Sequence, residues 1–200
     1  MARSRWSTWC EATRAKQDSS VRNIFVAGTS VHFWADERQI VEQLAREGHL
    51  GGWKVVYRPH PSRLREDLSW VWKLPVVELD GRLGYDLRPG FQEHIADRLA
   101  ASACVVAAFS TLIIEAALLG RPSIIPAFAQ SAHGPGGVLT HKNFEHMQAV
   151  VEWPGVFLCQ TLPGLIGKVR QAVAGKLDYD PGELRRRAQE VARSDGHAQE

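Results

Sequence analysis

The stretch that decides the fold reads Val105-Val-Ala-Ala-Phe-Ser-Thr-Leu-Ile-Ile-Glu-Ala-Ala-Leu-Leu-Gly-Arg-Pro-Ser-Ile-Ile125. Its apolar start predicts a buried strand, and Ser110-Thr111 predict a tight turn into a short helix. Gly120 and Pro122 end that helix and lead into a second buried strand. Parallel α/β sheets bind phosphates at such strand-turn-helix units, because the first N–H groups of the helix have no partner within it.

Glu115 is the only charged residue in the apolar helical run, one turn after Thr111. Burying a carboxylate without a partner costs several kcal/mol. We therefore expect Glu115 to face a cleft and to hold a polar group there.

Outward from this stretch, strand and helix patterns alternate along the chain. Alternation of this kind predicts parallel pairing with right-handed crossovers, and unbroken apolar strands predict a sheet covered on both faces. The expected fold is therefore α/β: a doubly wound parallel sheet of about six strands with helices on both faces. Strands are predicted at 23–27, 53–57, 75–79, 103–108, 123–125 and 156–159, and helices at 36–47 (with Gly48 as its stop), 91–101, 111–119, 162–174 and around 143–151.

The carboxyl ends of these strands carry polar groups, which a parallel sheet brings to one edge. His60 follows the second strand between two prolines, Pro59 and Pro61, which keep the local backbone extended. It can donate a hydrogen bond to a phosphate oxygen, and Arg58 can offer two. The alternative is that Arg58 and His60 simply end a strand at the surface. The predicted site groups are Gly28-Thr29-Ser30, Arg58-Pro59-His60, Ser110-Thr111 and the Gly-rich loop 133–137.

Composition bounds the remaining possibilities. A net charge of +2 is too small to indicate nucleic-acid binding. Three dispersed cysteines without a CxxC pair predict a reducing, cytoplasmic setting without disulfides. No apolar run is long enough to cross a membrane. The expected organisation is a polar lead-in (1–22, with Trp6 and Trp9), an α/β domain (23–176) and a helical tail (177–200) with a thin apolar stripe and solvated arginines at 185–187.

At these residues the chain resembles the C-terminal, donor-binding domain of GT-B-fold glycosyltransferases. The resemblance rests on Arg58-Pro59-His60-Pro61 and on Ser110-Thr111-Leu-Ile-Ile-Glu115-Ala-Ala-Leu-Leu-Gly120-Arg-Pro122. It is nearest to capsule-polysaccharide enzymes, sialyltransferase-like enzymes and the CDP-glycerol glycerophosphotransferases of teichoic-acid synthesis. Non-hydrolysing UDP-sugar 2-epimerases share the fold and a similar Glu-containing helix.

The resemblance implies a role for each matched residue. His60, Arg58, Ser110 and Thr111 would bind the phosphates of a CMP-, CDP- or UDP-type nucleotide sugar. Gly28, Thr29 and Ser30 would lie near the phosphates or the transferred group, and Glu115 would bind the ribose. The resemblance implies neither a metal nor another cofactor.

The resemblance also implies what this chain would need beside it. A complete GT-B enzyme has a second, N-terminal domain that supplies the acceptor site, so we expect that domain, a partner subunit or a homodimer, with localisation in the cytoplasm or peripheral at the inner membrane. The tail would then pack on the second domain. We assign no catalytic base, because Asp36, Glu37 and Asp86 look more like helix caps or surface acids. His133, His141 and His146 cluster near the Gly-rich loop, but His141 and His146 are five apart and do not share a helical face as zinc ligands would. The alternatives for this cluster are contacts to the nucleotide base or sugar, or a surface loop.

Three hypotheses about the function stay open. The chain is the donor half of a transferase for cell-surface polysaccharide synthesis, a nucleotide-sugar-binding or epimerase-like module, or a relative in fold alone. A flavodoxin-like domain with a metal site would have an acidic cluster at the strand ends, whereas this chain has histidine, arginine and hydroxyl groups there.

Overall fold

The computed structural model describes residues 23–29, 37–63, 67–80, 91–128 and 148–197. Within them six parallel strands form one sheet in the order β3-β2-β1-β4-β5-β6. The predicted α/β class and the doubly wound parallel sheet are confirmed. The strands are β1 (Asn23–Ala27), β2 (Lys54–Arg58), β3 (Val77–Leu79), β4 (Cys104–Ala107), β5 (Ser123–Pro126) and β6 (Val156–Cys159).

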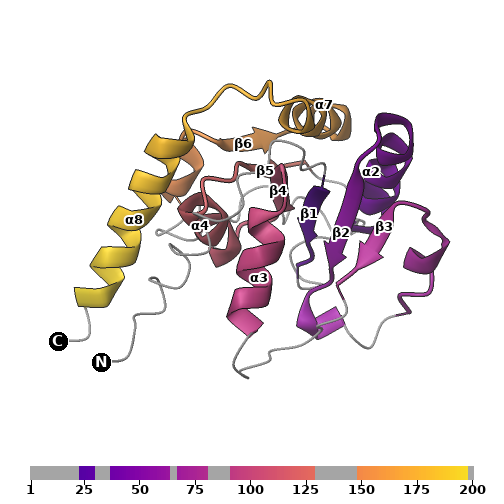
Figure 1. Ribbon diagram of the computed structural model, residues 1–200, viewed down its shortest axis with the longest axis horizontal. Coiled ribbons are helices and arrows are strands. Elements are labelled where there is room, and N and C mark those ends of the chain that lie inside the picture. The colour runs from indigo at the N-terminus through magenta and orange to yellow at the C-terminus, as the bar shows by residue number, and fades with distance from the viewer. Residues whose placement is uncertain (1–22, 30–36, 64–66, 81–90, 129–147, 198–200) are drawn as a thin grey trace.

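Helices cover both faces of the sheet (Figure 1). The helices α2 (Glu37–Gly51) and α7 (Leu162–Val173) pack on one face, and α3 (Phe91–Ala100), α4 (Thr111–Leu118) and α8 (Pro181–His197) pack on the other. Short 3-10 turns lie at η1 (Pro61–Arg63), η2 (Val71–Lys73) and η3 (Val150–Glu152).

Successive strand residues point to opposite faces, so the two cores share the central strands. In β1, Ile24 and Val26 belong to the core under α2 and α7, whereas Phe25 belongs to the core under α3 and α4. All three are fully buried. This two-sided burial is why the strands read as unbroken apolar runs.

The strand order reverses between β1 and β4. From β1 the chain turns outward to β2 and β3, and it then crosses back to place β4 on the other side of β1. The two strands run in register, with Ala27 opposite Ala107 at their carboxyl ends. This reversal is the point at which doubly wound sheets leave a crevice for ligands.

The first helix runs further than its sequence pattern predicted. Gly48 does not stop α2, which continues to Gly51 and is followed by Gly52 with φ 73°. A Cβ at Gly48 would lie 2.9 Å from Cδ1 of Trp53, so this glycine provides space for a buried tryptophan. Of the helix expected around 143–151, residues 143–147 lie outside the described residues, and Val150–Glu152 forms the η3 turn.

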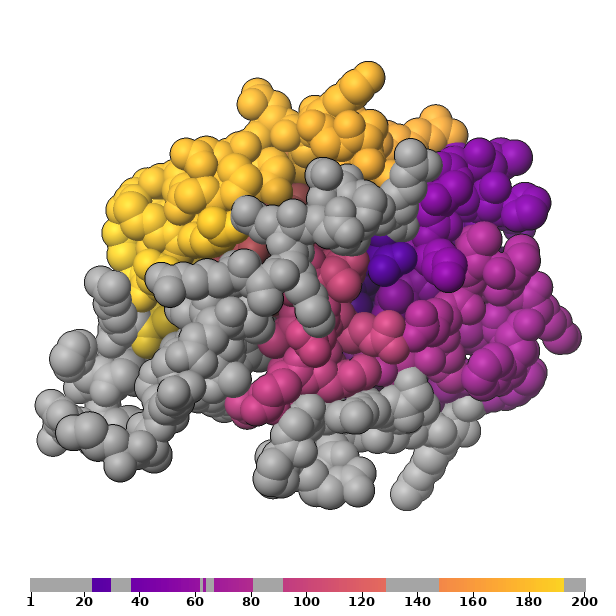
Figure 2. Space-filling view, viewed as in Figure 1, coloured from indigo at the N-terminus to yellow at the C-terminus, as the bar shows by residue number. Residues whose placement is uncertain are grey.

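The C-terminal tail is helical, as expected, but its apolar stripe is buried within this chain. Leu184 and Ala188 of α8 are both 0% exposed and pack with α4 in the core of that face. The space-filling view shows the yellow C-terminal segment continuous with the orange segment before it (Figure 2). Arg185 was predicted to be solvated, but its Nε is buried, close to the position that a Cβ on Gly120 would take.

Among the described residues, none of the helices is both long enough and apolar enough to cross a membrane.

Candidate functional site

The turns after β1 and β4 emerge side by side at the carboxyl edge of the sheet. Gly28 and Thr29 follow β1, and Ser110 separates the end of β4 from α4, which begins at Thr111. Because β1 and β4 are neighbours in register, four predicted site residues lie at the reversal of strand order. Ser30, the fifth member of this predicted group, lies outside the described residues.

The start of α4 leaves its hydroxyl groups uncommitted to capping. Ser110 has the extended backbone of an N-cap residue, yet within the described chain its side chain makes no cap hydrogen bond. In α7 the corresponding Thr161 hydroxyl accepts a hydrogen bond from Gly164 N at 3.1 Å, as an N-cap residue normally does. Both Ser110 and Thr111 are exposed. The first turn of α4 therefore presents hydroxyl groups and helix-end N–H groups to solvent.

Glu115 shares a helix face with Thr111, since residues four apart lie one above the other. Glu115 is half-buried, whereas its neighbours Ile114 and Ala116 are buried. Thr111 and Glu115 thus lie on a less buried side of α4, and the cleft expected at Glu115 stays a prediction.

His60 lies close to the turn after β1. The Gly28 N–H donates to the carbonyl of Arg58 at 2.7 Å, which ties the ends of β1 and β2 together. A Cβ on Gly28 would lie only 2.7 Å from the backbone nitrogen of His60. Partial burial and the positive charge of Arg63 lower the pKa of His60, which favours the neutral imidazole.

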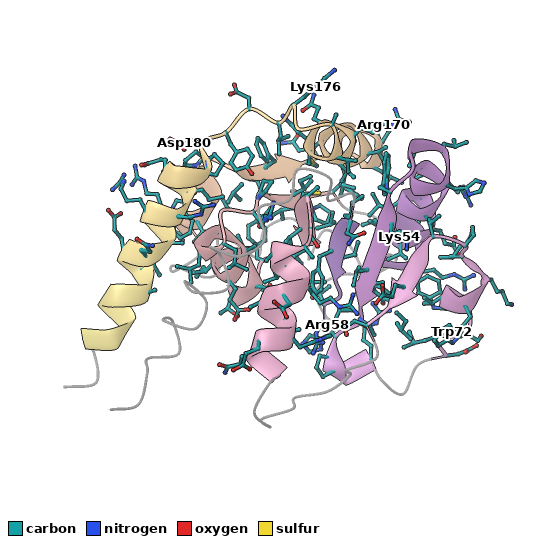
Figure 3. The ribbon with its side chains drawn as sticks, in the orientation of Figure 1. Lys54, Arg58, Trp72, Arg170, Lys176 and Asp180 are labelled. Carbon is teal, nitrogen blue, oxygen red and sulfur yellow. The ribbon has the colours of Figure 1, made fainter. Side chains whose placement is uncertain are left out.

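The Arg58 side chain makes an ion pair. Its Nη1 donates to Oδ2 of Asp80 at 2.8 Å, and Oδ1 of Asp80 lies 2.8 Å from Nε2 of His94 on α3. Figure 3 shows Arg58 and Lys54 at opposite ends of β2, with Arg58 at the end near the first turn of α3. Asp80 is 0% exposed; burial acts to raise its pKa, but His94 and Arg58 together hold that pKa below its usual value.

Asp80 and His94 were not found from the sequence, where Asp80 read only as the start of a turn. One signal was available: Asp80 directly follows the third predicted strand, at the same edge as His60.

The structure also corrects the expectation for Glu37. The sequence suggested a cap or a surface acid, but Glu37 is 1% exposed. Its Oε2 accepts hydrogen bonds from Thr29 N at 3.0 Å and from Arg63 Nη1 at 2.9 Å, and its Oε1 accepts one from the Tyr57 hydroxyl. Burial raises the pKa of Glu37, although Tyr57, Thr29 and Arg63 each act to lower it.

Several residues weighed in the sequence lie outside the described residues: Trp6, Trp9, Asp36, Asp86, the loop 133–137, His141 and His146. In the part of the chain that the structure describes, no three His, Cys, Asp or Glu side chains gather as they would around a metal ion.

Comparison with known proteins supports the fold. No protein-family model and no curated protein matches the chain. Among solved structures, UDP-GlcNAc 2-epimerase from Methanocaldococcus jannaschii matches with a TM-score of 0.55 and 14% identity, over 96% of this chain and 50% of that one. The same organism's UDP-GlcNAc 2-epimerase in complex with UDP-GlcNAc and UDP matches with a TM-score of 0.54 and 12% identity, over 94% and 52%.

At these identities the likeness shows the fold alone, which is a GT-B-like, Rossmann-type α/β unit. The chain spans about half the length of the solved structures that it resembles.

Proposed function

We propose that this chain is the donor-binding half of a GT-B-type glycosyltransferase or glycerophosphotransferase, and that it binds a nucleotide-activated sugar at the carboxyl edge of its sheet. The observation that carries the proposal is the meeting of Gly28-Thr29 with Ser110-Thr111 where the strand order reverses. Backbone N–H groups and hydroxyls at the start of a helix are the donors that phosphate oxygens require.

The other predicted residues have complementary roles in this proposal. His60, beside Gly28, donates a hydrogen bond to the phosphate group. Glu115 accepts hydrogen bonds from the ribose hydroxyls, one helical turn from the phosphate-binding end of α4. Displacement at the donor would release the nucleotide, whose developing charge these groups stabilise. The acceptor site and the general base would come from a second domain or subunit.

A specific observation favours one alternative. The structural neighbours with TM-scores above 0.5 include a UDP-GlcNAc 2-epimerase whose solved complex holds UDP-GlcNAc and UDP. An epimerase-like half that binds a UDP-sugar would use the same edge of the sheet. A preference for a cytidine nucleotide would favour the CDP-glycerol glycerophosphotransferase branch over the epimerase-like alternative, whereas a preference for uridine is compatible with both candidates.

Calorimetric titration with CMP, CDP, UMP, UDP, GDP and ADP tests the proposal. We expect selective binding of one nucleotide. His60→Ala and Glu115→Ala should each weaken it by about 1–3 kcal/mol, or about 5- to 150-fold, because each loses a charge-assisted hydrogen bond. His49→Ala and Glu152→Ala are matched controls, since both residues are exposed and lie at the opposite edge of the sheet.

Two outcomes contradict the proposal. If His60→Ala and Glu115→Ala bind as tightly as the wild type, the site residues are wrong. If the folded chain binds none of the six nucleotides, the donor-binding role itself is wrong.

A further inference from the structure

The buried carboxylate of Glu37 joins three segments that are separate in the sequence. It lies in the first turn of α2 and accepts hydrogen bonds from the turn after β1 (Thr29 N, 3.0 Å), from η1 (Arg63 Nη1, 2.9 Å) and from β2 (the Tyr57 hydroxyl). The Arg63 and Glu37 side chains are 15% and 1% exposed, so water competes little for this ion pair.

These contacts bracket the proposed phosphate site. Tyr57 and Arg63 stand three residues before and three residues after His60, so Glu37 fixes the chain on both sides of that histidine. The same carboxylate holds the N–H of Thr29. A Cβ on Gly28 would collide with Oε1 of Glu37 as well as with the backbone of His60, so the carboxylate fills the space between the two turns.

The energetics of the site favour a positional role over a stabilising one. The other inward positions of α2 hold apolar side chains such as Ile40, Val41 and Leu44. At Glu37 the cost of burial exceeds what Tyr57, Thr29 and Arg63 return, and the pKa of the carboxyl is raised. A raised pKa means that the stability linked to the protonated form is present below the unfolded value and is lost as the pH rises through the folded value. The carboxylate is therefore kept at a cost in burial, while its removal alone would leave the largely buried Arg63 cation without this anion.

We propose that Glu37 is a positioning residue: its carboxylate holds the turn after β1 and the segment around His60 in the mutual arrangement that phosphate binding requires. This role rests on the proposed function, because it concerns the same site. The ligand contacts belong to Thr29 and His60, whereas Glu37 acts through them from beneath the surface.

Glu37→Gln tests this role, because it keeps the size of the side chain and removes its charge. We expect the affinity for the preferred nucleoside diphosphate, and for pyrophosphate, to fall about 10-fold. The unfolding temperature should fall, since the neutral amide leaves the largely buried Arg63 without the charge of this partner. Amide hydrogen exchange at Gly28, Thr29 and His60 of the ligand-free protein should become faster.

A matched control lies on the same helix. Glu47 pairs with Arg170 at the far end of α2, so Glu47→Gln removes a charged pair without touching the site. It should change neither the affinity nor the exchange at Gly28, Thr29 and His60. If Glu37→Gln does not fold, Tyr57→Phe removes a single hydrogen bond to the same carboxylate and should weaken binding in the same direction.

The following results would overturn the proposal. Wild-type affinity in folded Glu37→Gln overturns the positioning role, and so does a loss of affinity without faster exchange at Gly28, Thr29 and His60. If the wild type binds neither nucleotides nor pyrophosphate, the proposed function is overturned. Unchanged amide exchange at Gly28, Thr29 and His60 in Glu37→Gln would then overturn the positioning role as well. Faster exchange there would show that Glu37 still orders the two segments.

Discussion

Gly28→Ala is the sharpest test of how closely the ends of β1 and β2 approach each other. The added Cβ would lie 2.7 Å from the backbone nitrogen of His60 and 2.9 Å from Cα of Pro59, and it would also collide with the carboxylate of Glu37. Two of these three obstacles are backbone atoms, so no side-chain rotation relieves them. The strand ends would have to separate.

The size of the effect follows from two opposing contributions. Overpacking a close-packed site costs about 1–3 kcal/mol. Replacing glycine with alanine returns about 0.4–1 kcal/mol by restricting the unfolded chain. The positive φ angles of the described glycines fall at Gly52, Gly120, Gly155 and Gly175, so backbone strain at Gly28 adds nothing. We expect a net loss of about 1–2 kcal/mol, which lowers the unfolding temperature by about 2–8 °C in a chain of this length.

Gly167→Ala is the matched control for the same chemical change. Gly167 lies inside α7, and a Cβ there would meet nothing within 4 Å among the described residues. Alanine should therefore stabilise the protein by about 0.5–1 kcal/mol through helix propensity. Thermal and urea unfolding of the two variants should shift in opposite directions. If Gly28→Ala is as stable as the wild type, the turn after β1 is not packed against His60 as described.

Two further predictions concern stability. Leu184→Ala should cost about 2–5 kcal/mol in urea unfolding, because Leu184 is 0% exposed between α8 and α4; a loss of under about 1 kcal/mol would mean that α8 does not pack there. Asp80→Asn should cost about 3–5 kcal/mol at neutral pH by leaving Arg58 without its buried partner. Because the folded pKa of Asp80 is lowered, its stabilisation is present above the unfolded value of 3.8 and is lost as the pH falls through the folded pKa. The gap between wild type and Asp80→Asn should therefore close in acid, and a gap that persists there would exclude the ion pair as its cause.

The sheet could be predicted from the sequence because a strand that is buried on both faces is a continuous run of apolar residues. The expected strands at Asn23–Ala27 and Val156–Cys159 agree with the structure at both ends. The limits of α2 were less well predicted. Gly48 looked like a helix stop, but its role is set by the packing of Trp53, a contact that the sequence pattern does not record.

The buried carboxylates were missed for a related reason. Glu37 meets Tyr57 and Arg63 across 20 and 26 residues of chain, and Asp80 meets His94 across 14. No short motif holds these pairs together. Alone, each acid looked like a residue that belongs at the surface, because charged residues are almost never fully buried without partners. The burial of these acids depends on partners from distant parts of the sequence, which only the fold brings together at one edge of the sheet.

The two acids change how the proposed phosphate site would work. Arg58 and Arg63, the two arginines that flank His60 in the sequence, are paired with Asp80 and Glu37. Each pair is largely withdrawn from water, and in each the cation is matched by a buried anion. Recognition of a nucleotide by this edge would then rest on directed donors: the N–H groups at the start of α4, the hydroxyls of Ser110 and Thr111, and an imidazole whose lowered pKa favours its neutral form. Such donors read the positions of phosphate oxygens more than their total charge, because their geometry is fixed before the ligand arrives. The arginines and their acids would then serve by fixing that geometry. This gives a structural role to both arginines that flank His60, Arg58 and Arg63.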